Sequence, residues 1–230
     1  MVIFDAASSQ DEDWTGPVLD SQHRLPTLGS VERFHGPIWS VHAETVDFGG
    51  HQVQRDVLLH LGAVAVIALD DRDRVLLIRQ YRHPVGMLLF EAPAGLLDIP
   101  DEDPAETAAR ELAEEAGYEA EHWHVLVDFL NSPGGSSEAI RVFLARGLTA
   151  IPGGRHRTGE AEEAHLPKVW VDLDEAKELV LSGAINSPPA VCGVLAAWAA
   201  RAGDWRSLRD GTAPWPTREW LLEQGRIHRR

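Results

Sequence analysis

The sequence predicts an α+β fold in which a mixed β-sheet is sandwiched between helices (α/β/α), preceded by a small N-terminal antiparallel β subdomain. Three observations predict this fold class. Residues 31–60 alternate between apolar and polar side chains on either side of Gly49-Gly50, a pattern typical of a hairpin. Two apolar runs at 62–69 and 75–81 are typical of buried strands. A helix over 104–116 follows them, and further strands and two late helices complete the pattern.

Local signals predict where the individual elements begin and end. The polar turn at 70–74 joins the two apolar runs, and we expect these two strands to pair. Residues 88–91 form a short strand that leads into a turn at Pro93-Ala94-Gly95. Pro104 suits the first turn of the helix, where its missing N–H does no harm, and Gly117 caps the end. The later strands are predicted around 124–130, 139–145 and 169–173, and the later helices at 174–182 and 189–202.

Four segments are predicted along the chain. Residues 1–29 are acidic, rich in Ser and Asp and without periodicity, so we expect a flexible N-terminal tail. Residues 30–61 form the β subdomain, 62–203 the main domain and 204–230 a C-terminal tail. Because aromatic side chains mainly bury area, we expect packing anchors at the tryptophans of this last segment: Trp205, Trp215 and Trp220.

Composition excludes several classes of partner. The chain has 230 residues, enough for one domain of ordinary size with an accessory subdomain. Its formal charge of -15 opposes binding to nucleic acid or to an anionic membrane. The one cysteine, Cys192, allows no internal disulfide and fits a reducing cytosol. The N-terminus lacks the basic flank of a signal peptide, and no apolar stretch is long enough to span a membrane. We therefore expect a cytoplasmic protein with neither nucleic acid nor a membrane as partner.

Three carboxylates crowd one face of the helix predicted at 104–116. Glu111, Glu114 and Glu115 are three and four residues apart, and like charges at that spacing destabilise a helix. Only Arg110 compensates them locally. A run of glutamates is often just a solvated helix face. Clustered carboxylates are also what Mg²⁺ prefers, and a metal that contacts phosphate oxygens can position an attacking water. The cluster therefore predicts a metal platform for pyrophosphate chemistry.

The longer string around this helix resembles the Nudix box, Gly-x5-Glu-x7-Arg-Glu-U-x-Glu-Glu-x-Gly-U, in which U is a bulky apolar residue. Its positions are filled in order by Gly95, Glu102, Arg110, Glu111, Leu112, Glu114, Glu115, Gly117 and Tyr118. In one departure, six residues and not five separate Gly95 from Glu102, and the extra residue falls in the loop before the helix, where an insertion costs little.

Segments outside the box resemble the ADP-ribose pyrophosphatase branch of this family, and in particular its actinobacterial-type enzymes. The resemblance runs from about residue 30 to 203. The segments that carry it are Arg55–Val57, Arg79–Arg82, Glu91–Gly95, Ser132–Glu138 and Ile185–Ser187.

This resemblance implies a Mg²⁺-dependent hydrolase, with Mn²⁺ as an alternative metal, that splits the pyrophosphate bond of ADP-ribose into AMP and ribose 5-phosphate. One rival is a pyrophosphatase for another nucleotide, such as a sugar nucleotide, NADH or a dinucleoside polyphosphate. A second rival is a sensor that binds ADP-ribose without cleaving it; the intact Glu111, Glu114 and Glu115 speak against it. The family also implies a homodimer that exchanges its N-terminal strands.

The same resemblance implies the metal ligands and the group that activates water. Glu111, Glu114 and Glu115 would hold the metal with the backbone carbonyl of Ala94, and Glu115 is counted among the catalytic residues. Arg110 would orient these carboxylates by ion pairing. For Glu102, a local salt bridge and a role at the metal both stay open. The general base would come from an acidic loop between the last strands, with Glu162 as first choice and Glu163 as second.

Substrate contacts are expected on the strands that flank the box. Arg79 and Arg82 lie in one strand, and we expect both guanidinium groups to face one side of the sheet and to bind phosphate oxygens. Trp39 and Arg55 would sandwich the adenine, since purines stack on aromatic and guanidinium planes. Two carboxylates complete the expected substrate contacts, Glu91 and Glu138.

Overall fold

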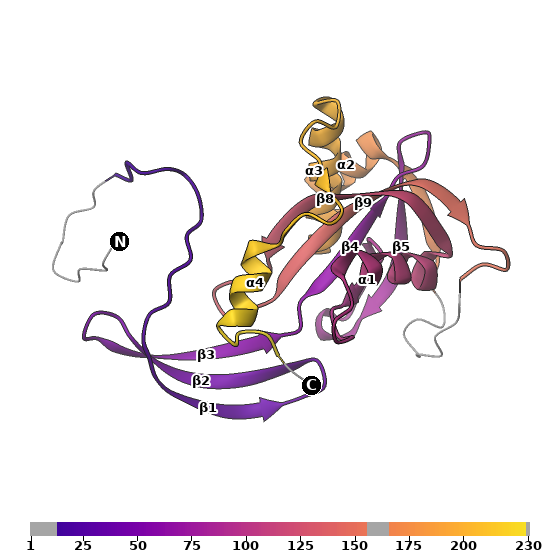
Figure 1. Ribbon diagram of the computed structural model, residues 1–230. Coiled ribbons are helices and arrows are strands. Elements are labelled where there is room, and N and C mark those ends of the chain that lie inside the picture. The colour runs from indigo at the N-terminus through magenta and orange to yellow at the C-terminus, as the bar shows by residue number, and fades with distance from the viewer. Residues whose placement is uncertain (1–12, 156–165, 229–230) are drawn as a thin grey trace. The chain divides into compact units, whose positions relative to one another are not determined.

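The structure, a computed structural model, describes residues 13–155 and 166–228 (Figure 1). These residues divide into two compact units. The N-terminal unit comprises residues 13–60 together with 132–137 and 216–228. The main unit comprises 61–131, 138–155 and 166–215. The predicted boundaries of the four segments stay predictions.

The N-terminal unit is built on a three-stranded antiparallel sheet of order β1-β2-β3. Its strands are β1 (Thr27–His35), β2 (Trp39–Asp47) and β3 (Gln52–His60), so β1 begins four residues before the pattern at Val31. Both glycines of the Gly49-Gly50 turn have positive φ, as a tight hairpin requires. The predicted hairpin is therefore confirmed.

The C-terminal end of the chain is part of this same unit. It contributes α4 (Pro216–Glu223) and then an ion pair of 2.5 Å between Arg226 and the buried Glu44 of β2. The backbone N–H of His228 donates to the carbonyl of His60 at the end of β3. Residues far apart in sequence thus complete the hydrogen bonding around the first sheet.

The main unit contains two sheets, of strand order β10-β5-β6 and β11-β8-β9-β4-β7. The pairing of β4 with β9 is parallel and every other pairing is antiparallel, so the predicted mixed sheet is confirmed. Most of these strands are visible by label or colour in Figure 1. Their bounds are β4 Ala63–Ala68, β5 Arg74–Arg82, β6 Met87–Glu91, β7 Ala94–Leu96, β8 Tyr118–Leu130, β9 Ala139–Ala150, β10 Lys168–Asp172 and β11 Arg209–Asp210.

Two predictions about these strands are wrong. The apolar runs that became β4 and β5 were expected to pair, but they lie in different sheets and only a bridge between Leu69 and Val75 joins them. Both runs are buried on both faces, and such a pattern does not specify which strand is the neighbour. The expected turn at Pro93-Ala94-Gly95 continues directly into β7, which pairs with β4. Pairing with a central strand overrides the local turn signal of Pro and Gly.

Helices cover the sheets of the main unit on opposite faces. Alternate residues of β4, Ala65 and Ile67, pack in one core with α2 (Leu173–Leu181) and α3 (Pro188–Ala202). Val64 and Val66 are equally buried but lie outside that core, because successive side chains of a strand point to opposite faces.

The other helical segment begins with α1 (Pro104–Glu111) and continues as a π-helical turn, Leu112–Ala116. It packs against β4, β7, β8 and β9. The predicted arrangement of a sheet between helices is confirmed. Among the residues that the structure describes, no helix combines the length and the apolar character needed to cross a bilayer.

Candidate functional site

Local signals fix the beginning of α1, the helix that carries the candidate site. Asp103 Oδ1 accepts a hydrogen bond of 2.8 Å from the N–H of Ala105, and Glu106 Oε2 accepts one of 3.3 Å from the N–H of Asp103. This is a capping box, which satisfies two N–H groups that have no partner within the helix. Pro104 occupies the first helical position, as predicted.

The end of this helical segment is wider than predicted. Gly117 has φ 72° and its N–H donates to the carbonyl of Ala113, so the glycine cap is confirmed. The last turn before it, Leu112–Ala116, is π-helical, a feature often found at functional sites. Two of the three predicted metal-ligand carboxylates, Glu114 and Glu115, lie in this turn.

Strand β7 lies directly against two of these carboxylates. The backbone N–H of Ala94 donates to Glu115 Oε2 at 2.8 Å. The side chain of Glu111 fills the space in front of Gly95, where a Cβ atom would overlap its carboxylate. Glycine is therefore required here for space, and not for the sharp turn that we predicted. Glu111 and Glu115 are 9% and 4% exposed, so the site holds two buried carboxylates beside one strand.

Arg110 joins the remaining acidic side chains of the box. Its Nε and Nη2 donate to the two oxygens of Glu102 at 3.2 Å each. Its Nη1 donates to Glu111 at 2.7 Å and to Glu114 at 3.3 Å. Hydrogen bonds from Arg110 hold the pKa of Glu102 below its usual range, and Glu102 in turn raises the pKa of Arg110. The ion pairing expected of Arg110 is present, and Glu102 forms the local salt bridge.

The chemistry of these donors fits a hard divalent cation. Glu102, Glu111 and Glu114 all accept from one guanidinium group, so three carboxylates gather around Arg110. Oxygen ligands of this kind are those that Mg²⁺ prefers. Within 13–155 and 166–228, no three Asp, Glu, His or Cys side chains already converge as a metal-binding group. Arg110 holds Glu111 and Glu114, and Ala94 holds Glu115.

The prediction that Arg79 and Arg82 face one side of the sheet is wrong. Residues three apart in a strand point to opposite faces. Arg82 shares a face with the buried Glu91 and pairs with it, at 2.6 Å between Nη2 and Oε2. Arg79 lies on the other face, 5.7 Å above the ring of Phe90. Arg82 is therefore tied to Glu91, which precedes Ala94 by three residues in the chain.

Two buried polar residues near the site were not singled out from the sequence. Gln80 lies on the Arg82 face of β5, and within the described part of the chain its Oε1 has no hydrogen-bond partner. Thr107 is completely buried in α1 and donates to Glu102. Gln80 could have been recognised from the sequence, because it is a polar residue inside an apolar stretch. Nothing in the sequence around Thr107 marks that residue.

The expected adenine sandwich does not form within one chain. In the β2–β3 register Trp39 lies opposite His60, whereas Arg55 lies opposite Glu44. The two side chains are five residues apart along the sheet, about 17 Å at ~3.4 Å per residue. Trp39 contacts Phe34 and Arg55 contacts Phe48. Within a single chain, Trp39 and Arg55 therefore cannot hold one adenine from two sides. Each of them remains a predicted substrate contact.

Three further residues were predicted at the site: Glu138, Glu162 and Glu163. Glu138 accepts a hydrogen bond of 2.7 Å from Asn131 at the start of β9, and its role stays a prediction. Glu162 and Glu163 lie outside the described residues. The chain on both sides of them contacts the end of the π-helical turn: Ile151 N–H donates to the Gly117 carbonyl, and Lys168 Nζ donates to the Ala116 carbonyl at 2.7 Å.

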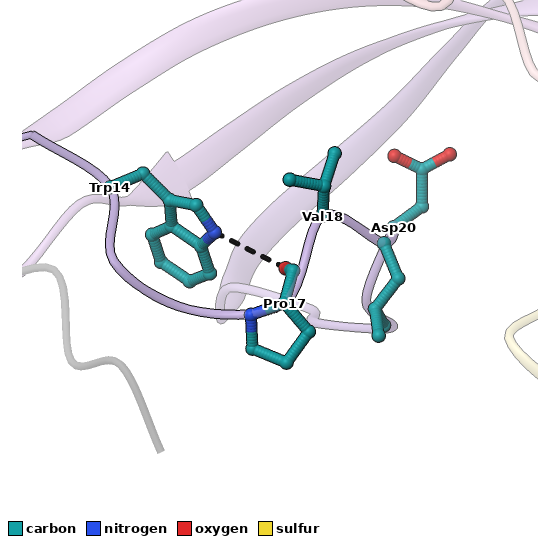
Figure 2. A pocket seen from close by; sticks show the side chains of 5 residues that line it. Trp14, Pro17, Val18 and Asp20 are labelled. Atoms are coloured by element: carbon teal, nitrogen blue, oxygen red, sulfur yellow. Dashed lines mark hydrogen bonds between the residues drawn. The ribbon is translucent and has the colours of Figure 1, made fainter.

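A surface hollow in the N-terminal unit does not resemble a nucleotide site. Figure 2 shows it within a short stretch of chain, with a hydrogen bond of 3.2 Å from Trp14 Nε1 to the Pro17 carbonyl. It offers no cationic group to bind phosphate. The residues that line it are Trp14, Pro17, Val18, Leu19 and Asp20.

Known proteins resemble this chain in sequence and in fold. The family model described as "NUDIX domain" matches residues 59–190. The chain is 42% identical to "ADP-ribose pyrophosphatase" of Mycobacterium tuberculosis, over 80% of this chain and 87% of that protein. It is 35% identical to "ADP-ribose pyrophosphatase" of Bacillus subtilis, over 68% of this chain and 83% of that protein. A solved structure, "Crystal structure of ADP compounds hydrolase", aligns with a TM-score of 0.65 at 22% identity, covering 91% of this chain and all of the other, and this likeness concerns the fold alone.

Proposed function

Because this chain belongs to the Nudix family, we propose that it hydrolyses the pyrophosphate bond of ADP-ribose to AMP and ribose 5-phosphate. The observation that carries the proposal is the pair of buried carboxylates, Glu111 and Glu115, held beside β7 with Arg110 at their side. Such a site suits a divalent cation that in turn binds a diphosphate. The relative that is 42% identical is an "ADP-ribose pyrophosphatase", which supports ADP-ribose as the substrate.

Glu111, Glu114 and Glu115 would hold a divalent metal, together with the backbone of Ala94. We propose Mg²⁺, with Mn²⁺ as a substitute. When bound, such a cation offsets the charge of the two phosphates and makes a nearby water easier to deprotonate. Arg110 is a positioning residue, because it holds Glu111 and Glu114 at fixed distances without itself contacting the substrate.

Other residues of the chain would bind the phosphates and accept the proton. The guanidinium of Arg82 is held by Glu91, and the side chain is 40% exposed; we propose that it binds a phosphate oxygen. Glu162, or as second choice Glu163, would take the proton from the attacking water. The chain on both sides of 156–165 supports this assignment, because it is hydrogen-bonded to the end of the helical segment that carries Glu111, Glu114 and Glu115.

We also propose a cytoplasmic homodimer. Exposed apolar side chains in and beside β1 and β2 support a partner surface there, because contiguous exposed apolar groups commonly mark interfaces. A dimer would bring a second copy of Trp39 and Arg55, which a single chain keeps too far apart to hold one adenine. The one cysteine supports a reducing compartment. The exposed side chains are Leu28, Val31, Phe34, Ile38 and Trp39.

The experiment that tests the function is product analysis of the purified protein with ADP-ribose, in the presence and absence of Mg²⁺. We expect metal-dependent release of AMP and ribose 5-phosphate, and loss of at least about a hundred-fold in rate for Glu115→Gln. Glu121→Gln, an exposed change in β8, is the matched control and keeps full activity. Faster cleavage of a sugar nucleotide, NADH or a dinucleoside polyphosphate would favour the first rival. Tight binding of ADP-ribose without any cleavage would favour a sensor.

A further inference from the structure

Thr107 is a polar side chain in the completely buried part of α1. Its exposed fraction is 0%, and a buried hydroxyl costs free energy unless it makes a hydrogen bond, a cost that valine would not have. Its hydroxyl donates to Glu102 Oε2 at 2.8 Å and lies 3.4 Å from the carbonyl of Asp103. The carboxylate is the shorter and better acceptor, so the hydroxyl is committed to Glu102.

Glu102 is held from two sides by the same helix. Thr107 and Arg110 are three residues apart on α1 and therefore lie on one face, where both reach back to Glu102 in the preceding loop. The two bonds from Arg110 are 3.2 Å long, whereas the bond from Thr107 is 2.8 Å. The hydroxyl thus makes the shortest hydrogen bond to this carboxylate among those that the structure shows.

The position of Glu102 determines where the other edge of Arg110 points. A guanidinium group is planar and presents its donors as a rigid fork. Its Nε and Nη2 are bound to Glu102, and its Nη1 is bound to Glu111 and Glu114. Since the group is rigid, a shift of Glu102 that carries Nε and Nη2 with it would also move Nη1 relative to these two carboxylates.

We propose that Thr107 is a positioning residue for the metal-binding carboxylates, acting through Glu102 and Arg110. The inference rests on the proposed function, in which Glu111 and Glu114 hold the metal. The pKa of Glu102 is lowered chiefly by the hydrogen bonds from Arg110 and further by the one from the Thr107 hydroxyl, which agrees with an ionised carboxylate held by both donors.

The test compares Thr107→Val with Thr107→Ser. Valine keeps the volume and loses the hydroxyl, whereas serine keeps the hydroxyl. Thr212→Val is the matched control, because it removes a hydroxyl bond of 2.6 Å to a carboxylate, Asp210, in an exposed turn elsewhere in the main unit. The readouts are Mn²⁺ binding by the protein alone, measured by electron paramagnetic resonance, the kcat and KM for ADP-ribose, and thermal unfolding.

We expect Thr107→Val to bind Mn²⁺ about ten-fold more weakly, since partners that orient metal ligands typically contribute ten-fold or more to metal affinity. Thr107→Ser and Thr212→Val bind it like the wild type. At saturating metal, the KM for ADP-ribose is unchanged in all three variants. If the valine variant does not fold, Thr107→Ala provides the same comparison.

Unchanged Mn²⁺ affinity in Thr107→Val overturns the proposal, and so does a lowered unfolding temperature without any change in affinity, because both point to a purely structural threonine. A wild-type protein that binds Mn²⁺ but does not cleave ADP-ribose refutes only the proposed function, since the binding comparison still decides the role of Thr107. A wild-type protein that binds no Mn²⁺ overturns both.

Discussion

Replacing Gly95 by alanine tests whether the close contact between β7 and the Glu111 carboxylate is needed for activity. A Cβ atom at this position would overlap three atoms of Glu111: Oε1, Cδ and Cγ. All three belong to a flexible side chain and not to backbone. The backbone of Gly95 has no positive φ, so alanine itself is not strained there. The substitution therefore displaces one carboxylate and leaves β7 in place.

The expected cost in stability is small and the expected cost in activity is large. Overpacking of a buried position costs about 1–3 kcal/mol, and the lower end applies here because Glu111 can rotate away. About 1 kcal/mol corresponds to a fall of roughly 2–4 °C in Tm for a chain of this size. Rotation moves the Glu111 carboxylate out of reach of its 2.7 Å bond from Arg110, which keeps its bonds to Glu102 and Glu114. With loss of a metal ligand added, kcat/KM should fall at least about a hundred-fold.

The assay measures kcat/KM for ADP-ribose over a range of Mg²⁺ concentrations, with thermal unfolding of the same samples. Gly203→Ala is the control, because its new Cβ would make only ordinary contacts at 3.5 and 3.8 Å beyond the end of α3. It should leave both quantities unchanged. A Gly95→Ala variant with wild-type activity at low Mg²⁺ would refute the reasoning, since Glu111 would then not be needed where the structure places it.

Two further predictions concern the side chains of Arg82 and Glu102. Arg82→Ala should raise the KM for ADP-ribose about ten-fold, whereas Arg79→Ala, on the opposite face, should change it less than about two-fold; equal effects in steady-state kinetics would contradict the assignment. The pKa of Glu102 is lowered by Arg110, so its contribution to stability is present above the unfolded pKa near 4.5 and is lost as pH falls through the folded value. Thermal unfolding between pH 6 and pH 3 should therefore show a difference between wild type and Glu102→Gln that shrinks toward the acid end, and a constant difference would rule this out.

Features set by neighbouring residues could be predicted from the sequence. The start of α1 follows from Pro104, and its end follows from Gly117, whose positive φ only glycine adopts at little cost. The resemblance to the box also predicted the ion pairing of Arg110 with neighbouring carboxylates, which the structure shows for Glu111 and Glu114. The π-helical turn at Leu112–Ala116 could not be predicted, because an ordinary α-helical turn would satisfy the same local pattern.

Features set by pairing between distant segments were missed. Strand β4 pairs with β9 in a register that joins Ala63 to Ile140, 77 positions further along the chain, and an apolar run carries no mark of such a neighbour. One error, in contrast, was avoidable, because the spacing of Arg79 and Arg82 already excludes a shared face. A hairpin turn at Gly49-Gly50 also places Arg55 opposite Glu44 and away from Trp39, so the sequence already indicates that one chain does not bring these two side chains together.

The discontinuous composition of the N-terminal unit has a consequence for synthesis on the ribosome. Residues up to His60 emerge first, but β3 bonds to Gly135 and Ser137, and the unit is completed only by 216–228. At roughly 5–20 residues per second, the interval between His60 and Pro216 lasts on the order of ten seconds. The main unit can close around its core during this time, since its last segment is translated just before α4. The sheet that is made first is therefore the last to obtain all of its hydrogen bonds.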